Sequence, residues 1–503
     1  MRYNRLYSTI QAISVRLFFC FVAFSFIAAS PYPDRVVLTW AGNPSNSQAV
    51  TWRTDRSVQR ALAQIAVAEE NGHDIRPTEI EATTTTFSSE LGGEVCYHSV
   101  NFTGLLPGTT YTYRVGDGDV WTEWFHFRTA SPNPEPFSFI YFGDAQADIK
   151  TYWSRVFHQA FRHAPYAAFT LHAGDLINRA ENDDQWGEWF NAPGWVNASV
   201  PVIATPGNHE YFYEGRGEKN DRKWTTKEGD TIRVRIEEEI KRDAEGVETG
   251  STIRAHSADG KTGVIQLDAK SRIIGTDKGI RAMTGYREKE LAGVKANQSP
   301  LQDRYAEPGS PRLSSFWQPQ FTFPQNGPEG VKESCYYIDY QGVRIVSLNS
   351  NEKEEEQLEW LREVLSNNPH KWTIITFHHP VFSPTLGRDN PELRSLWKPV
   401  LDEFKVDLVL TGHDHTYART HSEGTAYIVS VSGPKLYHLD KQEWMHRSAE
   451  KIQLYQIIRI DSGELTYEAY TATGRLYDKF TLKKQEGGKN NLMEEITDTI
   501  MSK

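Results

Sequence analysis

The sequence predicts two successive domains, an all-β sandwich followed by an α/β domain. The chain has 503 residues, more than one hydrophobic core normally supports. Short runs with period-two alternation fill the first part, whereas apolar strands alternate with helical patterns from residue 137 onward. In this second part, five polar clusters follow predicted strands, and they contain the candidate functional residues.

Residues 1–30 have the pattern of a secretory signal peptide. Arginines flank an uncharged stretch that becomes strongly apolar from Leu17 to Ile27 and ends in small residues. The stretch is short for a transmembrane helix, so we expect a secreted or periplasmic protein with no stable membrane insertion after cleavage. An uncleaved signal anchor and a lipoprotein modified at Cys20 are the alternatives.

The expected mature protein is acidic. The formal net charge is −11, and loss of the three arginines in residues 1–30, which contain no acid, makes it three units more negative. Such a surface argues against nucleic acids and anionic membranes as main partners. Cys96 and Cys335 would remain, and this pair defines no disulfide framework because both could equally be buried thiols.

Residues 31–130 are predicted to form the sandwich. The expected strands are 36–40, 49–52, 98–102, 110–115 and 124–127. Residues 105–111 resemble the tyrosine corner of fibronectin type III-like sandwiches, with Tyr111 as the corner residue. No cluster of metal ligands occurs in this stretch of sequence, so we expect a structural or positioning domain. A proline-rich linker, residues 131–136, follows it.

Residues 137–483 are predicted to form the α/β domain. The expected strands are 137–142, 167–171, 343–348, 372–377 and 406–410, and the expected helices cover 150–162, 358–365 and 393–404. The polar segment 215–299 is predicted to be an insertion, either a small β-rich module or a partly mobile loop. Residues 484–503 are expected to form a polar C-terminal tail.

The five polar clusters each follow an apolar strand. They are Gly143–Gln146, Gly174–Asn178, Gly207–Glu210, His378–Pro380 and Gly412–His415. Taken singly they are weak signals, because a Gly-Asp pair is usually a turn. Parallel strands point the same way, however, so their carboxyl ends converge on one crevice. Carboxylates and imidazoles brought together there are typical ligands of a metal pair, which predicts a two-metal hydrolytic site.

The five motifs and the order of the domains resemble the calcineurin-type metallophosphoesterases, and specifically their purple acid phosphatase-like branch with an N-terminal fibronectin-like domain. The resemblance covers residues 32–483 apart from the insertion, and it implies an αββα sandwich. It also implies a set of metal ligands: Asp175 bridges both ions, Asp144 and His415 complete the first position, and Asn208, His378 and His413 hold the second.

The resemblance further implies that His209 faces the substrate, where it binds phosphate or protonates the leaving oxygen. His209 and Asp175 are therefore the predicted catalytic residues. His379 and Arg388 are candidate substrate contacts, although a packed imidazole and an exposed loop arginine are the common alternatives. Asp414 is expected to orient an imidazole or to face solvent.

Two positions depart from the family's pattern. Coloured members place a tyrosine three residues after the bridging aspartate, where this chain has Asn178. Other members place a histidine two residues after the first aspartate, where this chain has Gln146. We expect Asn178, Gln146 or water to complete the first position. An iron–phenolate chromophore is not expected, and the two metal ions could be iron, zinc, manganese or magnesium.

The sequence therefore predicts an exported, acid phosphatase-like enzyme whose partner is a small phosphate monoester. The ion pair would lower the pKa of a bound water, and the resulting hydroxide would attack phosphorus directly, with inversion. A phosphodiesterase or nucleotidase using the same site is the nearest alternative. A binding or adhesion protein with a decayed site is the second, and the oligomeric state is not indicated by the sequence.

Overall fold

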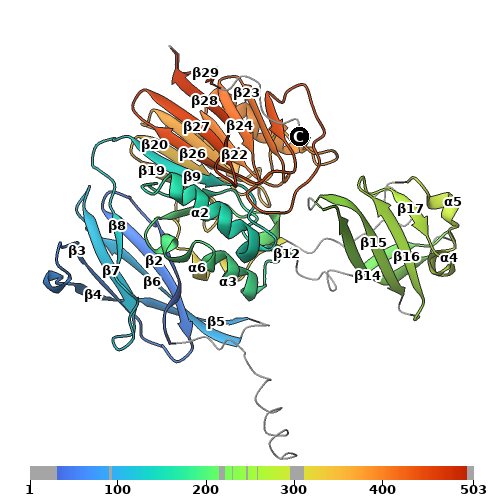
Figure 1. Cartoon of the computed structure of the whole chain (residues 1–503), viewed down its shortest axis with the longest axis horizontal. Helices are drawn as coiled ribbons and strands as arrows, with labels where there is room; N and C mark the ends of the chain where they lie inside the picture. Colours follow the sequence, from blue (N-terminus) through green and yellow to red (C-terminus); the bar gives the residue numbers. More distant parts are fainter. Residues whose placement is uncertain are drawn as a thin grey trace, which may run out of the picture.

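The computed structural model describes residues 31–89, 93–213, 221–228, 230–244, 247–257, 259–294, 311–485 and 487–495. The signal peptide predicted at residues 1–30 lies outside these ranges. Figure 1 shows a sandwich domain, a larger main domain and a smaller β-rich module that extends from it. Within the described ranges, no helix is long and apolar enough to cross a membrane.

The N-terminal sandwich consists of two four-stranded antiparallel sheets, with strand orders β1-β2-β6-β5 and β4-β3-β7-β8. Its strands are β1 (Asp34–Thr39), β2 (Ser47–Asp55), β3 (Leu62–Val67), β4 (Thr78–Glu81), β5 (Thr83–Ser89), β6 (Gly93–Thr103), β7 (Thr110–Gly116) and β8 (Phe125–Arg128). The sequence patterns did not predict β3, β4 and β5. Strands β4 and β5 are largely exposed and consist mainly of threonine, serine and glutamate. They therefore lack the alternation of apolar and polar residues by which a strand is predicted.

The tyrosine corner is confirmed. The Tyr111 hydroxyl accepts a hydrogen bond of 2.8 Å from the backbone N–H of Leu106. The sandwich is also joined to the main domain by polar contacts: the Arg35 guanidinium lies 2.7 Å from the Asp183 carboxylate, and the Tyr113 hydroxyl donates a 2.6 Å hydrogen bond to the Ala198 carbonyl. This domain therefore packs directly against the domain that carries the polar clusters.

The main domain contains two seven-stranded sheets. The first has the order β11-β10-β9-β26-β27-β28-β29 and the second the order β19-β20-β21-β22-β24-β23-β25. The first comprises β9 (Phe137–Phe142), β10 (Thr170–His172), β11 (Val202–Ala204), β26 (Leu454–Ile460), β27 (Glu464–Thr471), β28 (Leu476–Lys484) and β29 (Asn490–Glu494). The second comprises β19 (Tyr336–Tyr340), β20 (Val343–Ser347), β21 (Trp372–Thr376), β22 (Leu408–Thr411), β23 (Tyr417–Ser422), β24 (Thr425–Val429) and β25 (Arg447–Ala449).

Helices cover the sheets and complete the αββα sandwich, so the predicted fold class is confirmed. Its helical elements are η2 (Ile149–Trp153), α2 (Ser154–His163), α3 (Asp183–Asn191), η3 (Gly194–Ala198), α6 (Trp317–Gln320), α7 (Gln357–Ser366) and α8 (Pro391–Glu403). Neighbouring residues of β21 show the two faces of one strand: Ile374 belongs to the large central core, whereas Ile375 packs with Leu361 of α7 and Trp397 of α8. The helix predicted from residue 150 begins as the π-helical turn η2 and continues as α2.

The described part of the predicted insertion folds as a β-rich module with a core of its own. Its elements are β13 (Asp221–Thr225), β14 (Thr231–Arg242), β15 (Glu248–Ser257), β16 (Thr262–Asp268), β17 (Ile273–Thr276), α4 (Lys278–Thr284) and α5 (Glu288–Leu291). The strands form one antiparallel sheet in sequence order, and Val234, Ile265 and Ile280 are buried in its core. At the root of the module, β12 (Tyr211–Tyr213) pairs with β18 (Pro311–Leu313).

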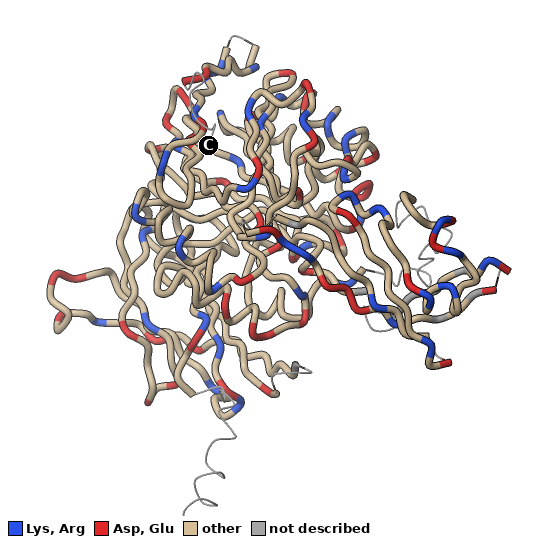
Figure 2. Tube along the Cα trace, turned by 45° about the vertical axis from the view of Figure 1, so that its right-hand side comes forward, with Lys and Arg blue, Asp and Glu red and all other residues tan. Residues whose placement is uncertain are grey.

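Three further features of the chain differ from, or add to, the sequence-based expectations. The segment 484–503 was expected to be a polar tail, but β29 within it pairs with β28 as the edge strand of the first sheet. Acidic and basic residues both occur in each part of the trace in Figure 2. The described cysteines, Cys96 and Cys335, are both free and buried.

Candidate metal centre

The polar clusters lie at the carboxyl ends of parallel strands from both sheets. Three of them follow β9, β10 and β11, which run parallel in the first sheet, and two follow β21 and β22, which run parallel in the second. Strand ends from two facing sheets can therefore supply ligands to one place, as expected for an open α/β sheet.

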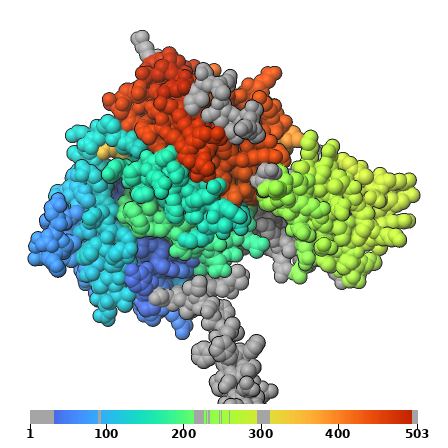
Figure 3. Space-filling view, in the orientation of Figure 1, coloured from blue at the N-terminus to red at the C-terminus, as the bar shows by residue number. Residues whose placement is uncertain are grey.

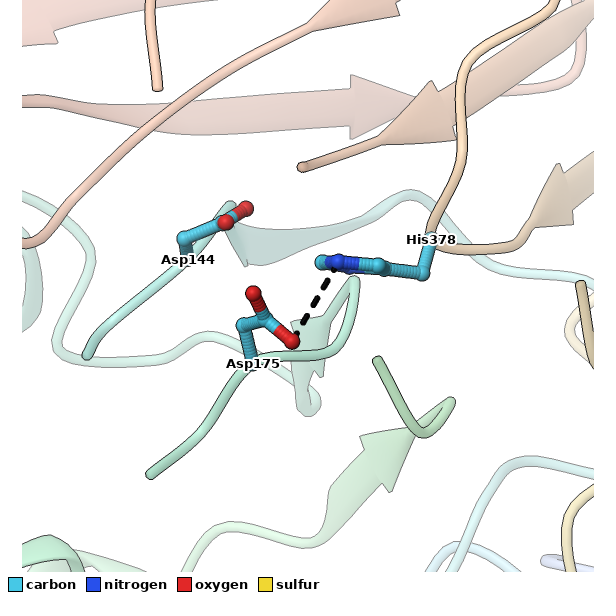
Figure 4. A group of neighbouring side chains, drawn as sticks. All are labelled: Asp144, Asp175 and His378. Carbon is cyan, nitrogen blue, oxygen red and sulfur yellow. Dashed lines mark ion pairs between the residues drawn. The ribbon is translucent and has the colours of Figure 1, made fainter. Parts of the chain in front are cut away.

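Three members of these clusters form a compact, fully buried group. Ligand atoms of Asp144, Asp175 and His378 all lie within 4.8 Å of one another. Figure 4 shows the two carboxylates and the imidazole converging, with Asp175 Oδ1 3.3 Å from His378 Nε2. Buried carboxylates need a compensating positive charge, which makes this group a candidate metal site.

A second group of ligand atoms surrounds His378. Its Nε2 lies 3.2 Å from Asn208 Oδ1 and 3.2 Å from His413 Nδ1, and the last two atoms are 2.9 Å apart. With Asp175 Oδ1 these atoms make four potential ligands from four loops. This is the set that the family resemblance implies for the second ion, and the structure brings all its members together.

The first position is formed around Asp144 and His415. His415 Nε2 lies 3.0 Å from Asp144 Oδ2. That carboxylate oxygen is buried and accepts no hydrogen bond among the described residues, although the other oxygen, Oδ1, accepts one of 2.7 Å from the His413 N–H. A lone pair on nitrogen facing an unsatisfied carboxylate oxygen fits a cation between them, so the residues of the first position also suit a metal.

Backbone carbonyls fix the tautomers of two of the imidazoles. His378 Nδ1 lies 2.8 Å from the Ala173 carbonyl, and His415 Nδ1 lies 2.6 Å from the Lys435 carbonyl. A carbonyl can only accept, so both Nδ1 atoms donate and both Nε2 lone pairs are directed toward the cluster. This is the usual way in which proteins orient histidine ligands.

The electrostatics of the centre favour positive charge. Burial lowers the pKa of His378, but the Asp175 carboxylate outweighs it and raises the pKa to about 9. Burial likewise raises the pKa of Asp175, yet the charges of His378 and His209 hold it well below the usual value. The pair therefore keeps Asp175 ionised and places a cation beside it, in the form of a proton or of a metal that displaces the proton.

Three of the candidate ligands have a strained backbone. Asp175, His413 and His415 have positive φ angles of 51°, 73° and 50°, a region that non-glycine residues rarely adopt. Such strain concentrates at functional sites because the surrounding structure must hold it. Two glycines also allow the backbone to approach the carboxylates closely: a Cβ on Gly207 would lie 2.2 Å from Asp175 Oδ1, and one on Gly412 would lie 2.1 Å from Asp144 Oδ1.

The sequence patterns assigned no role to Glu210, although it ends one of the five clusters. Its fully buried carboxylate accepts hydrogen bonds from the backbone N–H groups of Asp175, Leu176, Ile177 and Gly207, at 2.7–3.2 Å. Burial, followed by the charge of Asp175, raises its pKa to about 8. Glu210 thus ties the Asp175 loop to the Asn208 loop. A role for it could have been predicted, because it is an acidic residue at the end of one of the five clusters.

His209 lies at the open side of the cluster. Its side chain is 20% exposed, and its Nε2 is 4.0 Å from Asp175 Oδ2. Its Nδ1 lies 2.7 Å from the Asn178 carbonyl, so Nδ1 donates and Nε2 is left on the side of the carboxylate. Asn178, predicted as a metal ligand, therefore contacts this site through its backbone carbonyl, and the coordinating role of its side chain stays a prediction.

His379 and Arg388 both border the second group. The His379 ring centroid lies 4.2 Å from that of His413, and burial, followed by the charge of His378, lowers the pKa of His379 to about 3. Arg388 Nη2 lies 2.6 Å from His413 Nε2, while its Nε donates a 2.9 Å hydrogen bond to the buried Asp414 carboxylate. Arg388 is thus a fixed cation beside the second position rather than an exposed loop arginine, and Asp414 orients it instead of an imidazole.

Gln146 stands at the position where the family pattern has a histidine ligand. Its Nε2 lies 2.5 Å from Asp175 Oδ2 and 3.1 Å from His415 Nε2, while Lys435 Nζ lies 3.4 Å from its Oε1. Tyr437 stacks on His415 with ring centroids 4.4 Å apart. Lys435 and Tyr437 were not identified from the sequence, because no ligand motif marks the loop after β24.

Two family models match the chain. The purple acid phosphatase N-terminal domain matches residues 33–129, and calcineurin-like phosphoesterase matches residues 138–255 and 296–417. The fold and the strand-end cluster therefore define a calcineurin-like phosphoesterase domain. With its N-terminal domain, the chain belongs to the purple acid phosphatase-like branch of these phosphoesterases.

Individual relatives support this assignment. Human acid phosphatase type 7 is 32% identical over 194 residues, which are 37% of this chain and 42% of that protein. Purple acid phosphatase 4 of Arabidopsis thaliana is 28% identical over 126 residues, which are 24% of this chain and 37% of that protein. The matched region thus spans less than half the length of these curated relatives.

Solved structures share the fold at low sequence identity. The purple acid phosphatase PPD1 from yellow lupin has a TM-score of 0.61 at 16% identity, covering 91% of this chain and 75% of that one. The structure of PhoD has a TM-score of 0.53 at 12% identity, covering 95% and 94%. At these identities, the likeness concerns the fold alone.

Proposed function

We propose that the protein is an exported, metal-dependent phosphomonoesterase of the acid phosphatase type. The observation that carries the proposal is the position of Asp175, whose Oδ1 lies 3.3 Å from His378 Nε2 and whose Oδ2 lies 2.5 Å from Gln146 Nε2 on the side of His415. One carboxylate thus faces two groups of ligand atoms, which is the geometry that a shared, dinuclear site needs.

We assign Asp144 and His415 to the first ion, Asn208, His378 and His413 to the second, and Asp175 to both. Zinc, manganese and iron all suit this mixture of carboxylate, amide and imidazole. When bound, the ion pair supplies Lewis-acid charge for the phosphoryl oxygens and lowers the pKa of water. The phenolate of coloured relatives is replaced by Asn178, so we propose a colourless enzyme.

His209 is proposed to act on the leaving group. It is on the exposed side of Asp175, and its Nδ1 is fixed by the Asn178 carbonyl. A proton held on Nε2 would therefore lie beside the bound phosphoryl group, where it can be passed to the departing alcohol.

Arg388 is proposed to contact the phosphoryl oxygens, since the Asp414 carboxylate and the His413 carbonyl hold its guanidinium beside the second position. A guanidinium fixed in this way offers charge-assisted hydrogen bonds to phosphate. His379 stays neutral at a pKa of about 3, and we assign it to packing against His413. This replaces the predicted substrate contact for His379.

The choice of monoesters is supported by the names of the relatives, acid phosphatase type 7 and purple acid phosphatase 4. To test it, the full chain would be supplied with Zn²⁺, Mn²⁺ or Fe²⁺ and assayed on p-nitrophenyl phosphate and bis-p-nitrophenyl phosphate. We expect chelator-sensitive turnover with a higher kcat/KM on the monoester. A higher kcat/KM on the diester would replace the proposal with a phosphodiesterase, and no turnover with no bound metal would leave a binding protein.

Export is proposed from residues 1–30 of the sequence, which have the charged, apolar and small-residue regions of a signal peptide. The substrate would then be a small phosphate ester outside the cytoplasm. The mass of the N-terminal peptide of the exported protein tests this proposal, and an N-terminus that retains residues 1–30 would contradict cleavage.

A further inference from the structure

The segment Lys435–Tyr437 surrounds His415, a ligand of the proposed first ion. The Lys435 carbonyl accepts the His415 Nδ1–H at 2.6 Å, and the Tyr437 N–H donates a 3.1 Å hydrogen bond to the His415 carbonyl. The Tyr437 ring also stacks on the imidazole, with the two planes 26° apart. The orientation of His415 therefore depends on where this segment lies.

The inserted module contacts the same segment through the tip of its β14–β15 hairpin. Val247, at the tip, forms an isolated parallel β-bridge with Leu436, the residue between Lys435 and Tyr437. Both partners are buried, with Val247 at 0% and Leu436 at 6% exposure. Figure 3 shows the module in contact with the C-terminal part of the main domain.

The burial of Val247 does not come from the core of the module. That core is made of residues such as Val234, Ile265 and Ile280, and Val247 is not among its members. A fully buried valine at a hairpin tip, outside the core of its own module, is covered by the surface on which the hairpin rests. The contact with Leu436 is thus an interface between two separately packed units.

Contacts of Asp243 hold the hairpin tip beside this bridge. The Asp243 N–H donates to the Val247 carbonyl at 2.9 Å, and the Val247 N–H donates to Asp243 Oδ1 at 2.8 Å. The other oxygen of Asp243 lies 3.8 Å from Lys451 Nζ of the main domain. One aspartate therefore closes the turn and also anchors it beside the bridge.

The root of the module lies at the other ligand loop. Strand β12 begins at Tyr211, directly after Asn208–Glu210, and pairs with β18 on the far side of the insertion. The module consequently connects the loop of Asn208, a proposed ligand of the second ion, with the segment that holds His415, a proposed ligand of the first. The labels β12 and β14 in Figure 1 mark this root and the hairpin.

We propose that the inserted module braces the metal centre, with Val247 and Leu436 as positioning residues that hold Lys435–Tyr437 and thereby orient His415. The inference rests on the proposed two-ion site, and it gives the insertion a role in assembling that site. Loss of the brace is expected to weaken the first ion position and to leave the second, where the Ala173 carbonyl orients His378, largely intact.

The test uses Val247→Asp in the full chain, because a buried carboxylate cannot remain against Leu436. Ile240→Asp on β14 is the matched control, since Ile240 is 43% exposed. Hydrogen exchange at Tyr437 and competition between the protein and a chelator for Zn²⁺ are measured. We expect Val247→Asp to speed exchange at Tyr437 at least about tenfold and to reduce tightly held Zn²⁺ from two ions to one. The control should match the wild type in both.

Exchange in β16, which contributes to the core of the module, shows whether the module stays folded, and Val247→Ala is the milder variant if it does not. Unchanged exchange at Tyr437 in Val247→Asp would overturn the brace, as would faster exchange with both ions still held tightly. A wild-type protein that binds no pair of Zn²⁺ ions would refute the proposed function instead, and exchange at Tyr437 would still report whether the hairpin holds the segment.

Discussion

The two proposed ion positions share Asp175 but differ in what surrounds them. The second position gathers Asn208, His378 and His413 within 3.2 Å of one another. The first has Asp144 and His415, and its remaining side is occupied by the Gln146 amide, whose Nε2 faces Asp175. One position is therefore complete in side-chain ligands, whereas the other is held by fewer and weaker groups.

The fixed positive charge of Lys435 makes the first ion position less favourable still than the second. Lys435 Nζ lies 3.4 Å from Gln146 Oε1, and the ammonium contributes to lowering the pKa of His415, where burial is the larger cause. A cation already present near the first position repels a metal ion and reduces the charge that the carboxylates can still accept. A shared carboxylate therefore does not make two equal sites, and we expect the first position to bind a divalent ion less tightly than the second.

The largest effect should come from removing the shared ligand. Asp175→Asn takes one charge from both positions, so we expect loss of both ions and a fall in kcat/KM on the order of 10³-fold or more. Metal analysis and assays on p-nitrophenyl phosphate measure it, with the exposed Asp184→Asn as control. Retention of two ions in Asp175→Asn would show that no carboxylate is shared.

Single ligand removals should separate the positions. His378→Ala is expected to empty the second position and His415→Ala the first, each lowering activity by more than about 100-fold. Because the first position binds less tightly, the wild type should lose that ion first to a chelator, in two resolved steps. Simultaneous release of both ions would contradict the inequality.

Two substitutions should strengthen the first ion position. Gln146→His replaces an amide that donates toward Asp175 by an imidazole that can coordinate, so we expect the first ion to bind roughly tenfold more tightly. Lys435→Met should act in the same direction by removing the ammonium, and it serves as the companion variant. Chelator competition reports both, and unchanged release of the weaker ion in each would show that neither residue belongs to the first position.

The smallest effect concerns the substrate beside the second position. Arg388→Met removes one charge-assisted contact, so KM should rise about tenfold while both ions remain bound. Asp414→Asn, which loosens Arg388 without touching substrate, should raise KM by less. Steady-state kinetics with metal analysis measures these changes, and a KM equal to that of the wild type in Arg388→Met would exclude a contact with phosphate.

Much of the fold could be predicted from local sequence patterns. The Leu361 face of α7 and the alternating strands of the sandwich follow from apolar periodicity, and the Tyr111 corner follows from a short motif. Strands β4 and β5 could not be predicted, because strands that are exposed and mostly polar gain their order from pairing with neighbours. The edge strand β29 was not predicted for the same reason, since a polar segment has no apolar periodicity and becomes a strand by pairing with β28.

The same contrast holds for the candidate site. Ligands such as Asp144, Asn208 and His413 lie in motifs after strands, so their residue types and their positions along the chain are enough to indicate metal binding. Lys435 and Tyr437 carry no such mark, because they reach His415 only through the path of the loop after β24.

By itself the sequence determined the succession of a sandwich and an α/β domain, the identity of the candidate ligands, and the presence of Asn178 and Gln146 where the family pattern has a tyrosine or a histidine. Those properties depend on residue type and on local spacing, which are fixed along the chain. Only the tertiary structure decided that Gln146 faces Asp175, that Arg388 is held by Asp414 and that Val247 meets Leu436. Such contacts join residues far apart in sequence, and they are set by the packing of whole elements, which no local pattern records.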